Sequence, residues 1–242
     1  DFLDVRVSKW HDDYHVFKNG VKDLEVMFTN VINNAFEGTT TVIDQVHLTE
    51  TFFWLAKRDA VKRCVERKAT ETIAKLLNQI TQSRTEFESR RGHPPLRLNE
   101  PQYAGSALWA NSLLIAIKEG YEALQRIVHL SSHRDIEELV DSYNTYLTAI
   151  NDFKLSRYNT WMDQLNEKAK NNGLQVRLEK SIMRRIEGGK QILCNFDEDL
   201  LALFNEVNHW EKFHGEYSIP YVAHDICNKR DLLRVMREVV ML

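Results

Sequence analysis

Apolar residues recur at spacings of three and four along most of the chain, which is the period of a helix with one buried face. The pattern leaves open whether the helices predicted over about 46–66 and 67–91 are one continuous helix. In the first helix we expect seven apolar residues to share one face: Val21, Leu24, Met27, Phe28, Val31, Ile32 and Ala35. In all, the spacing predicts helices over residues 1–36, about 46–66, 67–91, 104–130, 133–170, 197–214 and 220–242.

One segment departs from this helical period. Leu174, Val176 and Leu178 alternate with polar residues, and Gly188-Gly189 lies between this segment and a second apolar stretch that ends at Cys194. Alternation of this kind with a Gly-Gly turn is typical of a β-hairpin. We therefore predict one hairpin within about 174–195, packed against a helical face because an isolated hairpin is marginal in water.

The chain contains only four prolines, and three of them lie between residues 94 and 101. Proline lacks a backbone N–H and disfavours helix in the residue before it, so this stretch should be an extended linker. We expect a first helical bundle segment over 1–92, a Pro-rich linker over 93–103 and a second helical bundle segment over 104–242. The predicted fold class is predominantly all-α, with stacked bundles of long antiparallel helices and one inserted hairpin.

Composition narrows the classes of function. The net charge is −3 and charged residues of both signs make up 28% of the chain, so the surface has no overall attraction for nucleic acid or an anionic membrane. Basic runs between residues 57 and 91 alternate with glutamates, which favours a salt-bridged surface over a nucleic-acid groove. The three cysteines form no Cys-x-x-Cys pair, and free thiols suit a reducing compartment. No apolar run near 18 residues predicts a membrane span.

The candidate phosphate-loop pattern fails on residue type, and the candidate zinc patterns fail on spacing or lack a third ligand. The Gly188-Gly189-Lys190-Gln191 run resembles a phosphate loop, but Arg184 stands where the first glycine belongs and Gln191 replaces the Ser or Thr that binds magnesium. His209 and His214 are five residues apart, whereas a zinc-binding helix needs a spacing of four. We therefore expect no catalytic residues, no cofactor and no metal in these residues.

The segment from 193 to 220 is the most informative in the chain. Asn195-Phe196-Asp197 follows a short apolar run and precedes an amphipathic helix, whose first-turn N–H groups Asn195 or Asp197 can cap. The helix should stop near Gly215, and Ile219-Pro220 should open the next element. We expect this helix to bury five apolar residues: Leu200, Leu201, Phe204, Val207 and Trp210.

This order of elements resembles the N-terminal stem, or tail, of dynein heavy chains. There a "vNFd" element, a helix with an "-EV-" pair and an "-IP-" or "-VP-" turn recur together, and a "P-x-x-x-G-x-x-x-W-a" segment precedes them. The last segment resembles Pro101 to Ala110 here, except that Asn111 stands where an arginine often follows. Residues 24–36 and 48–58 also resemble stem helices, of axonemal more than of cytoplasmic chains. The residues that match the family motifs are Asn195, Phe196, Asp197, Glu206, Val207, Ile219, Pro220 and Trp109.

The resemblance implies a non-catalytic scaffold segment made of stacked helical bundles. It implies heavy-chain assembly and docking of WD-repeat intermediate chains and light chains, in support of ATP-driven movement along microtubules. The ATPase sites of such chains lie outside this region, microtubule association is indirect, and neither nucleic acid nor membrane is a partner. The implied location is the cytoskeleton, in the axoneme of a cilium or flagellum.

An autonomous helical adaptor domain that binds a partner helix or peptide is the alternative. The two hypotheses separate on whether the reading frame continues past Leu242 into P-loop repeats. The start at Asp1 and the helical apolar period up to Leu242 make us expect a segment of a longer protein. Trp161, Trp210 and Tyr221 are candidates for a partner surface, whereas Phe196 should be internal.

Overall fold

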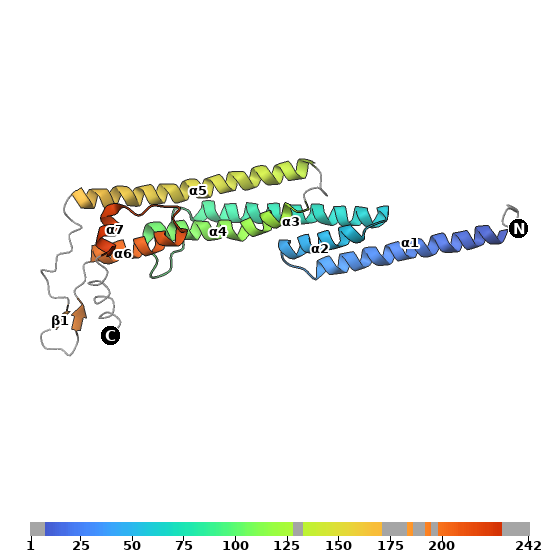
Figure 1. The fold of residues 1–242 in the computed structure, drawn as a ribbon, viewed down its shortest axis with the longest axis horizontal. Helices are drawn as coiled ribbons and strands as arrows, with labels where there is room; N and C mark the ends of the chain where they lie inside the picture. The colour runs from blue at the N-terminus through green and yellow to red at the C-terminus, as the bar shows by residue number, and fades with distance from the viewer. Residues whose placement is uncertain (1–7, 128–132, 171–182, 186–191, 195–197, 229–242) are drawn as a thin grey trace. The chain divides into compact units, whose positions relative to one another are not determined.

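The computed structural model describes residues 8–127, 133–170, 183–185, 192–194 and 198–228 of the 242-residue chain. Within them the chain is predominantly helical, as predicted (Figure 1). Within the same residues, no helix combines the length and apolarity needed to cross a bilayer. The helices are α1 (Ser8–Glu37), α2 (Val42–Leu55), α3 (Asp59–Arg90), α4 (Gln102–Leu124), α5 (His133–Lys170), α6 (Glu198–Trp210) and α7 (Tyr221–Asn228), with a 3₁₀ turn at Glu211–Phe213.

Local sequence explains where several helices begin and end. The Thr41 hydroxyl accepts a hydrogen bond from the Asp44 N–H at 3.1 Å, which caps the start of α2. The break between α2 and α3 lies at Ala56, whose backbone leaves the helical region at φ −78° and ψ 78°. We had expected a boundary, if any, near residues 66 and 67, which lie inside α3. The sequence did not predict the true break because residues 56–58 include neither Gly nor Pro, the residue types that usually mark the end of a helix.

The chain forms two compact units, each built from two sequence ranges. Unit 1 consists of Asp1–Thr85 and Ile115–Tyr146, and unit 2 consists of Glu86–Leu114 and Leu147–Leu242. Helices α3, α4 and α5 are therefore each divided between the units. The division of the chain into a bundle segment over 1–92, a linker over 93–103 and a bundle segment over 104–242 stays a prediction.

Each unit has its own core. In unit 1, α1, α2 and α3 meet around Ile32, Phe36, Val61, Cys64 and Val65. In unit 2, α4, α5, α6 and α7 enclose a cluster of small and aromatic side chains. Its buried members are Ala104, Ala107, Trp161, Leu165, Leu203, Val207, Trp210, Phe213, Ala223, Ile226 and Cys227.

Two three-residue strands lie in the segment where a hairpin was predicted. Met183–Arg185 (β1) pairs antiparallel with Ile192–Cys194 (β2), and Arg184 lies opposite Leu193. The rest of the 174–195 span, including Gly188-Gly189, lies outside the described residues. This short pair does not establish the inserted hairpin in its predicted extent, which stays a prediction.

Candidate functional site: the junction of α4 and α6 and the aromatic core beside it

The "-EV-" pair of α6 contacts the start of α4 in unit 2. The Glu206 carboxylate accepts two hydrogen bonds from backbone N–H groups, from Tyr103 to Oε1 at 2.9 Å and from Ala104 to Oε2 at 2.8 Å. Glu206 is only 6% exposed, and Val207 beside it belongs to the buried cluster. The motif therefore places a carboxylate and an apolar side chain on the same buried face.

The sequence around α4 explains why a carboxylate from another helix is needed. The first N–H groups of a helix have no partner within the helix, and the side chain before the helix usually supplies an acceptor. Here that residue is Pro101, which has no side-chain acceptor. The first turn of α4 also contains no acidic residue. Glu206 thus supplies the acceptor that the start of this helix lacks.

Burial and hydrogen bonding act on Glu206 in opposite directions. Burial raises the pKa of the Glu206 carboxyl, and the hydrogen bonds from Tyr103 and Ala104 lower it. The first effect is the larger, so the pKa lies above its ordinary value. The site is therefore a structural cap whose carboxyl group holds its proton more readily than an exposed glutamate does.

Neighbouring residues close the same junction. The Asn205 side-chain amide donates to the Asn99 carbonyl at 2.9 Å, which holds the loop before α4 against α6. A Cβ on Gly105 would lie 3.1 Å from the Glu100 Cβ and 3.2 Å from the Leu96 Cδ2. The glycine of the "P-x-x-x-G" segment is therefore the residue that lets this loop pack on the helix.

The other motif residues occupy two places. The Trp109 ring lies 6.0 Å from that of Phe87 and 6.5 Å from that of Phe153. Ile219 packs against the buried cluster, and the Pro220 carbonyl accepts from the His224 N–H at 2.9 Å at the start of α7. Asn195, Phe196 and Asp197 lie outside the described residues, so their predicted capping and internal roles stay predictions.

The buried face of α6 differs from the predicted one at Leu201, which is exposed, and at Leu203, which is buried. Leu203, Glu206, Val207 and Trp210 are buried, and Leu201 is 48% exposed. Leu201 is two residues from Leu203, which places it about 200° around the helix. Phe204 is half-buried, and the Leu200 side chain is outside the described set. The helix ends as expected before Gly215, which has φ 89°, and His214 before it has φ 52°.

The aromatic residues of unit 2 pack on one another. Trp210 lies 5.3 Å from Tyr158, 5.9 Å from Trp161 and 5.1 Å from Tyr217, between ring centroids. Trp161 is 5% exposed and Trp210 is fully buried. Trp210 is therefore buried as predicted from the apolar face of its helix. The burial of both rings within unit 2 contradicts their candidate role as exposed anchors on a partner surface. Tyr221 is 80% exposed, and its role in binding stays a prediction.

Sequence reasoning did not foresee a buried lysine beside these rings. The Lys154 ammonium lies 3.3 Å from Asn111 Oδ1, 3.1 Å from Glu216 Oε1 and 5.6 Å from the centroid of Phe213. Lys154 is 3% exposed, so these partners replace water around the charge. Nothing in the spacing of α5 distinguishes this lysine from the exposed ones.

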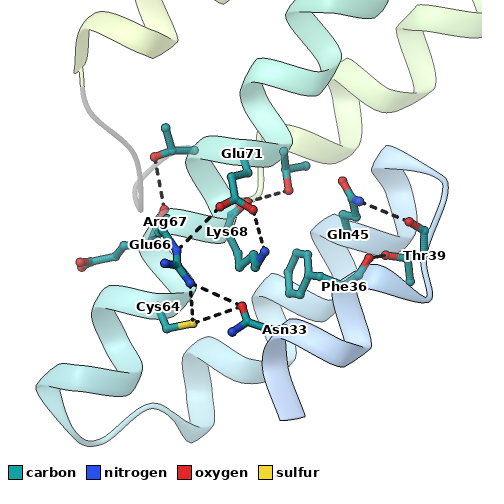
Figure 2. A network of polar contacts seen from close by, with 11 residues as sticks. Asn33, Phe36, Thr39, Gln45, Cys64, Glu66, Arg67, Lys68 and Glu71 are labelled. Atoms are coloured by element: carbon teal, nitrogen blue, oxygen red, sulfur yellow. Dashed lines mark hydrogen bonds and ion pairs between the residues drawn. The ribbon is translucent and has the colours of Figure 1, made fainter. Parts of the chain in front are cut away.

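A polar network joins α1 and α3 in unit 1. Figure 2 shows the Arg67 guanidinium pointing toward Asn33 and Cys64, with Nη2 at 3.4 Å from Asn33 Oδ1 and 3.7 Å from Cys64 Sγ. Glu71 lies 3.7 Å from Arg67 and 2.7 Å from Lys68. The predicted salt-bridged surface is confirmed for these residues and for Arg90 with Glu86 at 3.1 Å. Such exposed pairs contribute little to stability.

Among the residues that the structure describes, no three His, Cys, Asp or Glu side chains lie close enough together to hold a metal ion. The described contacts of the junction do structural work: a helix cap, a loop anchor and an aromatic core.

Comparison with known proteins identifies the family. A protein-family model described as "Dynein heavy chain, N-terminal region 1" matches residues 1–242. The flagellar inner arm I1 dynein-1-beta heavy chain of Chlamydomonas reinhardtii is 30% identical over 244 residues, which cover 100% of this chain and 5% of the relative. Mouse dynein axonemal heavy chain 2 is 30% identical over 241 residues, which cover 99% of this chain and 5% of the mouse protein.

A more distant relative gives the same result. The gamma chain of the Chlamydomonas reinhardtii flagellar outer arm dynein is 24% identical over 221 residues, which cover 91% of this chain. The chain spans about 5% of the length of each of these relatives. On the match to the whole chain, it belongs to the dynein heavy chain family and corresponds to N-terminal region 1.

Proposed function

We propose that this chain is a non-catalytic scaffold segment of a dynein heavy chain stem, made of stacked helical bundles. It supports assembly of heavy chains and docking of intermediate and light chains for microtubule-based movement. The single observation that carries the proposal is the match of residues 1–242 to heavy chain N-terminal region 1. The relatives are named as axonemal, flagellar and ciliary dyneins, which supports a place in the axoneme of a cilium or flagellum.

The proposal places ATP hydrolysis outside these residues. The Glu206 site binds backbone N–H groups of its own unit, and the phosphate-loop resemblance at Gly188-Gly189 fails on sequence. Lys190→Ala should accordingly leave the behaviour of the chain toward ATP unchanged, as measured by calorimetry. Stoichiometric ATP binding that Lys190→Ala abolishes would contradict a scaffold role.

The docking face for a WD-repeat intermediate chain is proposed on the helices of the second half, residues 104–170 and 197–242. Exposed apolar side chains are present there, with Leu155 50% exposed and Tyr221 80% exposed. Such side chains become anchors when a partner buries them. A specific contact typically buries about 800 Å² on each partner.

The test is co-purification of the whole chain with an intermediate chain. Leu155→Asp and Tyr221→Asp should each reduce capture without lowering the melting temperature, because both side chains are solvent-exposed. Leu98→Asp is the matched control, since Leu98 is fully exposed in the loop before α4. Equal capture by all three variants would refute this docking face. No capture by the unchanged chain would refute the intermediate chain as its partner.

A further inference from the structure

The corner between α2 and α3 in unit 1 exposes two large apolar side chains in succession. Trp54 is 75% exposed and Leu55 is 57% exposed, and they are the last two residues of α2. The backbone leaves the helical region directly after them, at Ala56. A single exposed apolar residue needs no explanation, whereas adjacent large ones with a polar rim mark an interaction surface.

Partly exposed rings lie beside this corner. The Phe28 ring of α1 lies 6.1 Å from that of Phe52 near the end of α2, and both side chains are half-buried. Three residues of α1 that we expected on the buried face with Ile32 are instead exposed: Leu24, Met27 and Val31. α1 therefore buries one apolar face in the core of unit 1, where Ile32 lies, and leaves a second exposed.

Four cations follow the two apolar residues within nine positions. Lys57 and Arg58 come just after the break, and Lys62 and Arg63 lie about one turn into α3; all four side chains are exposed. Asp59 is the only acidic residue of the first turn, so residues 57–63 carry a formal charge of +3. The start of a helix is stabilised by negative charge, so the helix itself gains nothing from this positive excess.

The described residues leave part of this positive charge without a counter-charge. Two of the cations are in ion pairs: Arg58 Nε lies 2.6 Å from Glu25 Oε1, and Lys62 Nζ lies 4.0 Å from Glu66 Oε1. The Arg63 Nε donates to a backbone carbonyl at 3.3 Å. Among the residues that the structure describes, neither Arg63 nor Lys57 is paired with a carboxylate.

We propose that this corner, residues 54–63, binds an acidic amphipathic helix of a partner protein. Large apolar side chains of the partner cover Trp54 and Leu55, and its carboxylates pair with Lys57 and Arg63. A helix suits the corner because residues three and four apart share a face, which sets an apolar row beside an acidic one. The inference rests on the proposed scaffold function, to which it adds a docking surface in unit 1.

Carboxylates among the cations favour a protein partner over nucleic acid or an anionic bilayer. Glu25, Asp59 and Glu66 belong to the same charged set. A phosphate backbone or a lipid surface presents closely spaced negative charge, which these carboxylates repel. A helix can place its acidic side chains opposite the cations alone.

Fluorescence anisotropy of the whole chain with a labelled synthetic helix tests the proposal. The helix consists of leucine, glutamate and alanine, with the leucines at spacings of three and four. The unchanged chain should bind it, and added salt should weaken the binding. Trp54→Ala with Leu55→Ala, and Lys57→Glu with Arg63→Glu, should each raise the dissociation constant at least about 10-fold. Melting temperatures should not fall, because all four side chains are exposed.

Lys9→Glu with Lys18→Glu is the matched control. It changes the net charge by the same amount at two exposed positions of α1 outside the corner, so the dissociation constant should stay within about 2-fold. An equal loss in this control would show that net charge alone attracts the helix, and would overturn the proposal.

Three further results would also overturn it. They are no binding of the synthetic helix by the unchanged chain, tighter binding of single-stranded RNA, and tighter binding of phosphatidylserine vesicles. Capture of the intermediate chain depends on Leu155 and Tyr221 in unit 2. Failure of the corner therefore leaves that docking assay unaffected, and the two proposals fail separately.

Discussion

The Glu206 carboxylate shows how one side chain can hold a helix junction. Its two oxygens accept hydrogen bonds from the N–H groups of Tyr103 and Ala104, and neither group has another acceptor among the residues that the structure describes. A buried N–H group left unpaired costs about 1–3 kcal/mol. Glu206→Ala leaves two such groups and should lower the free energy of unfolding by about 2–4 kcal/mol in chemical denaturation. A loss no larger than that of an exposed substitution would show that the cap is energetically unimportant.

The same residue predicts a dependence on pH. Because the pKa of Glu206 is raised in the folded chain, its contribution to stability is complete below the unfolded pKa and is lost as pH rises through the folded pKa. Glu206→Gln does not titrate. The unfolding free energy of the unchanged chain minus that of Glu206→Gln should therefore fall as pH rises from about 4.5. A difference that grows over this interval would show that the hydrogen bonds outweigh burial.

Trp210 and Tyr221 make a matched pair of aromatic residues in unit 2. Trp210 is fully buried among other rings, whereas Tyr221 is 80% exposed. Trp210→Ala should lower the free energy of unfolding by about 3–5 kcal/mol through the cavity it leaves. Tyr221→Ala should change it by less than about 0.5 kcal/mol. Comparable losses in thermal or denaturant unfolding would mean that α7 packs differently from the structure.

At the scale of elements, two helical glycines should respond oppositely to alanine. A Cβ on Gly20 of α1 meets nothing within 4 Å, so Gly20→Ala should raise the free energy of unfolding by about 0.5–1 kcal/mol through helix propensity. A Cβ on Gly120 of α4 would lie 3.3 Å from the Leu76 Cδ1, and Leu76 is fully buried. Gly120→Ala should lower the unfolding free energy by about 1–2 kcal/mol. Stabilisation by both substitutions would show that Leu76 can move aside.

The helices themselves could be predicted from the sequence, because long runs with a 3.6-residue period override local detail. The break at Ala56 could not, since it follows from one residue's backbone angles and contains no helix-breaking residue type. The core face of α1 was mistaken because two apolar faces overlap in one pattern. Trp161 and Trp210 were candidates for a partner surface because apolar spacing does not say whether a neighbour in the same chain or a partner covers a side chain.

The partner of Glu206 was the part of the junction that could not be predicted. The "-EV-" pair could be recognised, but the hydrogen bond from Tyr103 joins residues 103 apart in sequence. One signal was available, since Pro101 opens a helix without a side-chain acceptor and without an acidic first turn. Such a helix requires an acceptor from elsewhere, although the sequence alone does not say which.

At the scale of the whole molecule, the ranges of the two units set limits on fragments. Unit 2 includes Phe87, whose ring lies 6.0 Å from that of Trp109 and 5.3 Å from that of Phe153. A fragment over 86–242 should therefore unfold more cooperatively and at higher temperature than one over 104–242. Circular dichroism melts of the two would decide this. Equal melting temperatures would support the predicted division at 93–103.

The Glu206 cap also has a consequence for synthesis of the chain. Ala104 leaves the ribosome 102 residues before Glu206, which at about 5–20 residues per second is a delay of roughly 5–20 s. During that interval Glu206 is not yet available to the first turn of α4, and α6 is not yet available to cover Ala104 and Ala107. A nascent heavy chain therefore passes this stretch in an unfinished state, in which holdase chaperones have time to bind.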